Sequence, residues 1–199
     1  KSFFRHLPPA YVSNQKWVGH SGTTNQVDVA ANELALTDAE SQDVNTPLDG
    51  QPYASTGTDV LYASFKVVFT AASTAGGSYF AHFKDTGTGF RGRVWALATN
   101  LPGGQFRIWL SSATSPAPTA LLPIELSINT PFTVVVRLSV SDAVSTVWIN
   151  PTAESDTGAT TEAGAGINVT SFAFRHSTGI GTMRIDNLLV GTAFADVVS

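Results

Sequence analysis

Short segments in which apolar and polar residues alternate are the feature that most constrains how this chain can fold. In the clearest of them, residues 61–69, every second side chain is apolar: Leu61, Ala63, Phe65, Val67 and Phe69. A period of two places these side chains on one face of a strand, so the segment predicts a half-buried β-strand. The same reasoning predicts strands over 78–84, 90–97, 105–111, 132–141, 144–150, 168–176 and 182–190.

Glycine and proline separate these segments at intervals too short for helices. Residues 75–78, 85–89 and 101–104 are expected to be turns, and residues 112–123 and 151–166 are expected to be loops. Many antiparallel strands joined by irregular loops indicate two sheets packed face to face. The pattern therefore predicts an all-β, two-sheet antiparallel β-sandwich of the jelly-roll type.

Two segments need a choice between alternatives. Residues 29–44 have helical composition, but the apolar positions between 27 and 36 favour two strands around a turn at 31–32. At the end of the chain, Ile185 and the leucines that follow it are expected to complete the core. Asp186 and Asn187 are expected to hold a turn there, with ion binding as the alternative.

Composition limits which classes of protein fit this fold. The chain has 199 residues, no cysteine, 13% charged residues and a formal net charge of −4. A domain of this size buries roughly 70% of its unfolded surface, so it needs no disulfide or metal. The lack of cysteine fits an exported bacterial protein at least as well as a cytosolic one. The acidic balance argues against nucleic-acid binding, and no apolar run approaches the ~18 residues of a membrane span. We expect one domain over 17–199, with 1–16 as an N-terminal extension or first strand.

Motifs spread along the chain resemble a family of bacterial extracellular domains. They include residues 17–22 (WVGHSG), 79–83 (YFAHF), 90–94 (FRGRV), 172–176 (FAFRH) and 185–188 (IDNL). Members of this family are concanavalin A-like, or laminin-G-like, jelly rolls that occur in large exported proteins. The resemblance covers nearly the whole chain from Trp17 onward and implies a secreted or cell-surface location. It implies no defined reaction or ligand.

A set of arginines and tryptophans on the predicted strands suits sugar binding. Opposite the apolar positions lie Arg91, Arg93, Trp95, Arg107, Trp109, Arg137 and Trp148. Indole rings stack on the apolar face of a pyranose, and guanidinium groups bind carboxylate or sulfate. If these strands share one sheet, the seven side chains form an aromatic and cationic ligand-binding face. The alternative is that they cover the sheet as cross-strand neighbours under loops.

Catalytic patterns are sparse. The histidines lack the His-Glu-x-x-His spacing of a zinc site, and no predicted sheet strand carries the two carboxyls of a retaining glycosidase. Tyr79 and His82, near Arg91 and Arg93 in the chain, would suit the base and the charge-neutralising groups of a polysaccharide lyase. A hydrogen-bonded structural histidine is the favoured interpretation, so we expect no catalytic residues.

Oxygen-bearing side chains gather in one polar stretch, at Asp38, Glu40, Asp43 and Asn45. Calcium takes six to eight oxygen ligands, but this spacing lacks the central glycine and final glutamate of an EF-hand. The sequence favours a solvated acidic loop, with a structural calcium ion as the alternative.

Three functional hypotheses follow. The first is a non-catalytic extracellular domain that binds a polysaccharide or a cell-surface glycan. The second is a self-associating subunit of a surface layer or fibre, a homo-oligomer in which the N-terminal segment adds a strand to a neighbour's sheet. The third is a polysaccharide lyase.

Overall fold

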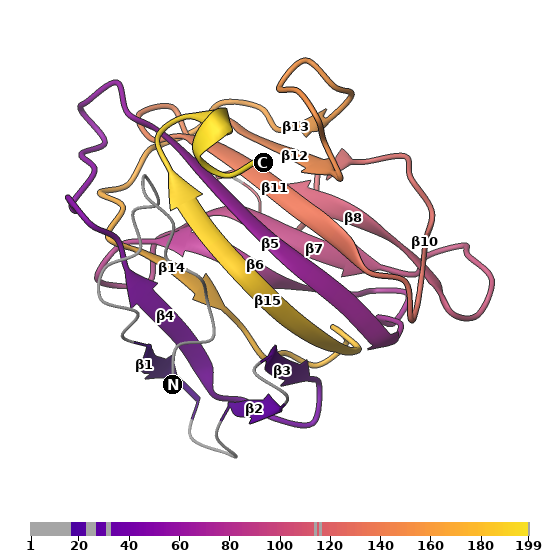
Figure 1. The fold of residues 1–199 in the computed structure, drawn as a ribbon. Helices are drawn as coiled ribbons and strands as arrows, with labels where there is room; N and C mark the ends of the chain where they lie inside the picture. Colours follow the sequence, from indigo (N-terminus) through magenta and orange to yellow (C-terminus); the bar gives the residue numbers. More distant parts are fainter. Residues whose placement is uncertain (1–16, 23–26, 31–32, 114, 116, 199) are drawn as a thin grey trace.

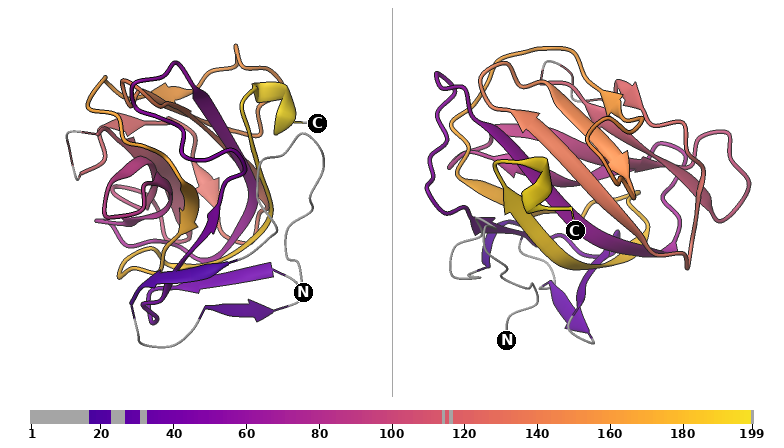
Figure 2. Two further views of the ribbon diagram at one scale, coloured as in Figure 1. Left: turned by 90° about the vertical axis from the view of Figure 1, so that its left-hand side faces the viewer. Right: turned by 45° about the horizontal axis from the view of Figure 1, so that its top comes forward.

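The computed structural model describes residues 17–22, 27–30, 33–113, 115 and 117–198. They form two antiparallel sheets that pack face to face (Figures 1 and 2). The expected all-β, two-sheet sandwich is confirmed, whereas the expected N-terminal extension lies outside the described residues. No helix in these ranges is long and apolar enough to cross a membrane.

The first sheet has the strand order β1-β4-β14-β6-β7-β8-β10, with β9 paired to β8. Its strands are β1 (Val18–Ser21), β4 (Asp43–Pro47), β14 (Ser171–Phe174), β6 (Ser78–Lys84), β7 (Phe90–Leu97), β8 (Gln105–Ser111), β9 (Ala120–Leu121) and β10 (Leu126–Ser127). The second sheet has the order β13-β12-β11-β5-β15-β3-β2. Its strands are β13 (Ala159–Thr160), β12 (Ser145–Ile149), β11 (Phe132–Ser139), β5 (Val60–Ala71), β15 (Thr182–Gly191), β3 (Glu33–Thr37) and β2 (Asp28–Ala30).

Local alternation predicted most of these strands. The hairpin expected over 27–36 is confirmed, since β2 pairs antiparallel with β3; its turn lies outside the described residues. The strand expected over 168–176 is shorter. Before β14, Val169 forms an isolated bridge with Tyr53, and after it the His176 ring binds the backbone of Thr37. Regular strand pairing is therefore limited to residues 171–174, and Thr170 and Arg175 on either side each donate one backbone hydrogen bond to β6.

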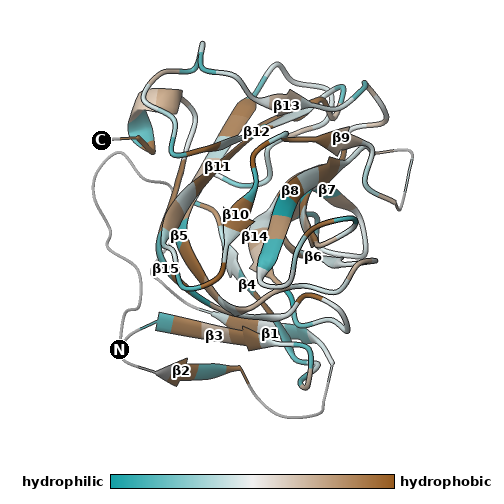
Figure 3. Ribbon diagram, turned by 90° about the vertical axis from the view of Figure 1, so that its right-hand side faces the viewer, coloured by the Kyte–Doolittle hydropathy of each residue, from teal (hydrophilic) through white to brown (hydrophobic). Residues whose placement is uncertain are grey.

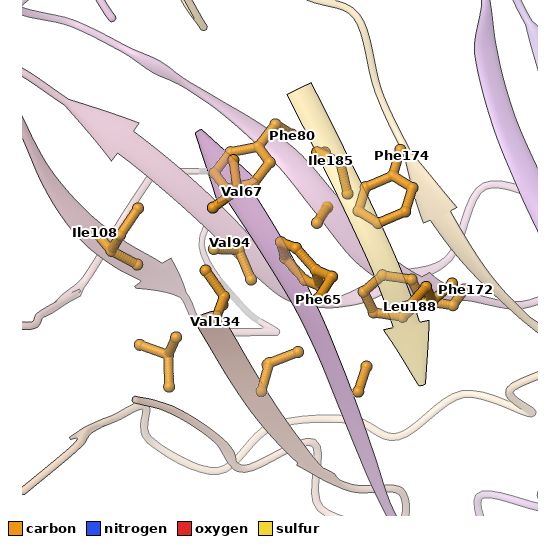
Figure 4. Packing of buried hydrophobic residues seen from close by; sticks show 14 of the residues in the cluster. Phe65, Val67, Phe80, Val94, Ile108, Val134, Phe172, Phe174, Ile185 and Leu188 are labelled. Carbon is orange, nitrogen blue, oxygen red and sulfur yellow. The ribbon is translucent and has the colours of Figure 1, made fainter. Parts of the chain in front are cut away.

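The core lies between the two sheets, with Phe65 of β5 at its centre (Figure 4). The Phe65 ring is fully buried and lies 5.2–6.1 Å from the rings of Phe80, Phe172 and Phe174. These edge-on and tilted contacts are the arrangements that aromatic rings prefer. The alternation predicted over residues 61–69 therefore supplies the middle of the core.

The last strand contains a β-bulge where the sequence predicted a turn. Pairing between β15 and β5 shifts between Asp186 and Leu189, and Asn187 has a left-handed φ of 56°. The extra residue changes the alternation, so that both Ile185 and Leu188 are buried in the core. The expected turn at Asp186 and Asn187 is wrong, but the expected core role of the residues around it is confirmed.

The C-terminal residues cover the outer face of the second sheet. A short 3₁₀ helix, η1 (Phe194–Asp196), follows β15, and Val197 joins a second apolar cluster with Tyr62, Val135 and Trp148. The Phe194 ring contacts those of Tyr62 and Trp148 edge-on, at centroid distances of 6.1 and 5.9 Å. This face of the second sheet is therefore partly a packing interface within the chain.

Candidate functional site

The seven arginine and tryptophan positions are divided between the two sheets. Strands β7 and β8 are neighbours in the first sheet, whereas β11 and β12, which carry Arg137 and Trp148, are neighbours in the second. The outer faces of two packed sheets point away from each other (Figure 2). Arg137 and Trp148 therefore cannot share a face with the other five residues.

Three aromatic side chains form a row across the outer face of the first sheet. Trp95 on β7 pairs with Tyr79 on β6 and with Trp109 on β8, and all three rings are partly exposed. The ring centroids of Tyr79 and Trp95 are 5.5 Å apart, and Trp95 Nε1 donates to Ser111 Oγ at 3.1 Å. Hydrophilic and hydrophobic residues alternate along β8 in Figure 3. The residues next to the three rings in the sequence point into the core: Phe80, Val94 and Ile108.

Arg91 does not belong to this row, although the sequence placed it in phase with Arg93. Arg91 pairs with Phe83, which points into the core, and pairing between β6 and β7 shifts between Ala81 and Phe83. Gly92, with a φ of 58°, provides the left-handed residue of this irregularity. The Arg91 guanidinium instead donates from Nε to the carbonyl oxygen of Ala165 at 2.7 Å.

Arg93 and Arg107 flank the row with different partners. Arg93 Nη2 donates to the carbonyl oxygens of Ser112 and Ser115, at 3.0 and 2.6 Å. Burial lowers the pKa of the Arg93 guanidinium, with the neighbouring Tyr79 acting in the opposite direction. Arg107 Nη2 binds Glu125 Oε1 at 2.6 Å and is therefore neutralised by a carboxylate.

Two histidines from distant parts of the chain meet beside Tyr79. The rings of His20 on β1 and His82 on β6 are 6.2 Å apart, and His82 also lies 4.4 Å from the ring of Phe90. His82 is fully buried and neither of its ring nitrogens has a hydrogen-bond partner among the described residues, whereas the Asn45 side chain acts on His20 as a hydrogen-bond partner. Burial lowers the pKa of His82 well below its usual value, and burial with the nearby Lys84 lowers the pKa of His20 to about 4. Both rings are therefore neutral at pH 7, and His82 is not the hydrogen-bonded histidine that the sequence favoured.

Arg175 connects this pair to the aromatic row. Its guanidinium carbon lies 4.3 Å from the centroid of the Tyr79 ring, within cation–π range, and its Nε lies 3.6 Å from Asp43 Oδ2. Ser21 Oγ also donates to Asp43 Oδ2, at 2.6 Å. Burial is the largest influence on Asp43 and raises the pKa of its carboxyl, although Ser21 and Arg175 act in the opposite direction.

Sequence reasoning singled out Tyr79, His82 and Arg93, and the structure brings them together. It missed His20 and Arg175, which join them only because β14 lies between β4 and β6 in the sheet. The linear sequence contains no signal for that strand order. The one available clue was the alternation around Arg175, which places its side chain on the same strand face as Ala173 and opposite Phe172 and Phe174.

The four residues named as ligands in the alternative calcium hypothesis have other roles where the structure describes their contacts. Glu40 Oε2 lies 3.5 Å from His176 Nε2, and Asp43 lies beside Arg175. Asp38 is exposed, and Asn45 belongs to β4. Among the described residues, no group of three or more histidine, aspartate or glutamate side chains is arranged to hold a metal ion.

The outer face of the second sheet offers a weaker alternative site. Trp148 is buried and its indole nitrogen donates to the carbonyl of Asp156, while Arg137 lies 3.7 Å from Glu154 and donates to Tyr62. A cavity of about 450 Å³ lies nearby, lined by Lys66 as its one charged residue and by no aromatic ring. Trp148 and Arg137 are thus engaged within the protein.

No protein-family model matches the chain, and no curated protein matches it. Solved structures share its fold. A sialidase superposes with a TM-score of 0.58 and 14% identity over 92% of this chain, which spans only 18% of the sialidase. An alginate lyase from Pseudomonas aeruginosa superposes with a TM-score of 0.57 and 9% identity, over 86% of this chain and 87% of the lyase. The exoplasmic/lumenal domain of VIP36, in its Ca2+/Man2-bound form, gives a TM-score of 0.52 and 13% identity, over 89% and 81% of the two chains. These similarities establish the fold alone, a concanavalin A-like sandwich.

Proposed function

We propose that this chain is a non-catalytic carbohydrate-binding domain whose ligand lies across Trp95 and Trp109, on the outer face of the first sheet. The observation that carries the proposal is the row of partly exposed rings on three adjacent strands. Rigid indole rings bind with little loss of conformational entropy and stack on the apolar faces of sugar rings. The arginines on either side of the row would bind carboxylate or sulfate groups carried by such sugars.

Structural relatives support this class of ligand. The VIP36 domain was solved with Man2 bound, and the sialidase and the alginate lyase are named for actions on carbohydrates. We further propose a secreted or cell-surface location, as implied by the resemblance to laminin-G-like domains of exported bacterial proteins. The low proportion of charged residues, 13%, agrees with that setting.

The geometry disfavours catalysis in the described conformation. His82, the nearest candidate base, is fully buried behind Tyr79 and Phe90, so a polymer on the surface would not reach its ring nitrogens. Arg91, one of the two expected neutralising groups, binds the backbone at the end of the sandwich instead.

Binding to a panel of immobilised polysaccharides tests the proposal. Trp95→Ala and Trp109→Ala should each weaken binding of a positive polysaccharide by about tenfold or more, as expected for aromatic anchors. Val29→Ala is the matched control, because it removes an apolar side chain that is 40% exposed at the edge of the second sheet. Retained affinity in both tryptophan variants would contradict the proposed face.

A polysaccharide lyase, the third hypothesis from the sequence, is favoured as an alternative because the structure brings Tyr79, His82 and Arg93 together. In such an elimination a base removes the proton beside the uronate carboxylate. The glycosidic C–O bond then breaks, a C=C bond forms, and the leaving oxygen gains a proton. Incubation with anionic polysaccharides should then produce unsaturated-uronate absorbance that Tyr79→Phe abolishes. Any such product would overturn the non-catalytic assignment.

A further inference from the structure

We propose that the ligand is an acidic glycan, a polymer bearing carboxylate groups, and that Arg93 selects it together with Lys84 and Arg175. This inference rests on the proposed function and specifies the chemistry of its ligand. The three residues, here called the cationic cluster, surround Tyr79 and His82 on the outer face of the first sheet.

The charges on this face are unbalanced in a protein that is acidic overall. Lys84, Arg93, Arg107 and Arg175 supply four cations, whereas the carboxylates that form ion pairs with them are Asp43 and Glu125. Within the described chain, neither Arg93 nor Lys84 has a carboxylate oxygen within 4.0 Å; Lys84 Nζ donates to the backbone carbonyl of Asp85. The formal net charge of the whole chain is −4. The positive charge is therefore a local property of this face.

Arg93 is incompletely satisfied within the described part of the chain. Its Nη2 donates to two carbonyl oxygens, its Nε is buried without a partner, and its Nη1 has no hydrogen bond in the described part of the chain. A partly buried cation loses hydration that neutral carbonyls replace only in part. A carboxylate from a ligand would supply the missing counter-charge through a charge-assisted hydrogen bond, which is stronger than a bond between neutral groups.

The guanidinium groups of Arg93 and Arg175 both lie near the Tyr79 ring. Their guanidinium carbons lie 5.9 and 4.3 Å from the centroid of the Tyr79 ring. After burial, which is the largest cause, His20, Arg175, Lys84 and Arg93 all lower the pKa of His82. Asp43, which forms an ion pair with Arg175, has a raised pKa because it is itself buried. An anionic sugar stacked on the neighbouring tryptophan would therefore enter a region of positive potential.

The experiment compares binding of the full chain to a polyuronate and to a neutral glucan of similar length, each at low and at high salt. Wild-type protein should bind the polyuronate at least about tenfold more tightly at low salt, and salt should reduce that preference. Arg93→Gln should weaken polyuronate binding by about ten- to a hundredfold and leave glucan binding within about twofold. Lys66→Gln is the matched control, because it removes one exposed cation from the outer face of the second sheet. It should bind both polymers like wild type.

Circular dichroism and thermal unfolding show whether Arg93→Gln is folded, and Arg175→Gln provides a second, independent variant with the same expected result. Equal wild-type affinities for the two polymers would overturn the acidic preference while leaving carbohydrate binding intact. Equal losses in Arg93→Gln and Lys66→Gln would also overturn it, because net charge alone would then explain the binding. Failure to bind any polysaccharide would instead overturn the proposed function, and the acidic preference with it.

Discussion

The pair formed by His20 and His82 predicts that this protein loses stability in mild acid. In the unfolded chain both imidazoles take up a proton near their ordinary pKa of 6.5, whereas the native state keeps His20 neutral to about pH 4 and His82 neutral to lower pH still. Below about pH 6.5 the unfolded state therefore binds more protons than the native state. The free energy of unfolding should fall as pH falls through this range.

The size of the effect follows from proton linkage. One proton bound only by the unfolded state changes stability by about 1.4 kcal/mol per pH unit. His82 is fully buried and should contribute close to that slope throughout roughly pH 6 to 4.5. The His20 ring is partly exposed to water, so we expect a total contribution of only about 1–2 kcal/mol from it.

Urea unfolding followed by tryptophan fluorescence, at several pH values from about 8 to 4.5, measures this slope for wild type and for His82→Phe. The phenyl ring keeps the contacts with Tyr79 and Phe90 and removes two nitrogens that have no partner in the described structure. His82→Phe should equal or exceed wild type near pH 8, and its stability should decline less steeply toward acid. Carboxylate titration is common to both proteins and cancels in the comparison. Parallel curves for the two proteins would refute the reasoning.

Further predictions concern the core, the bulge beside Arg91 and the buried histidine His176. Phe65→Ala should reduce the unfolding free energy by about 3–5 kcal/mol in urea titrations, whereas Phe65→Leu should reduce it by about 1.5 kcal/mol or less. Similar small losses in both variants would refute the central position of this ring. Gly92→Ala places a Cβ on a residue with left-handed φ, 3.3 Å from the Phe83 ring, so the urea midpoint of this variant should drop by the equivalent of about 1–2 kcal/mol. Gly76→Ala is the control, because its Cβ would meet no atom within 4 Å, and its unfolding free energy should change by less than about 0.5 kcal/mol. His176→Phe should cost about 1–3 kcal/mol, because it removes the hydrogen bond between Nδ1 and the Thr37 backbone, and a neutral effect would show that this bond adds no stability.

Local alternation predicted the strands because side-chain direction along a strand depends only on neighbouring residues. Phe65 and Ile108 face the core, and Trp95 and Trp109 face outward, as period two requires. The prediction failed where one extra residue changes the period. At Gly92 it moved Arg91 out of the aromatic row, and at Asn187 it turned an expected turn into a bulge.

The candidate site required more than local pattern. His20, Tyr79 and Arg175 are far apart in the chain and become neighbours only because their strands lie in the order β1-β4-β14-β6. The same long-range order placed Trp148 on the opposite side of the sandwich, where the C-terminal residues cover it. The sequence by itself thus determined the fold class and which side chains avoid the core, since both depend on local period and composition. The tertiary structure alone decided which of those side chains meet, because strand order is set by packing between residues distant in the chain.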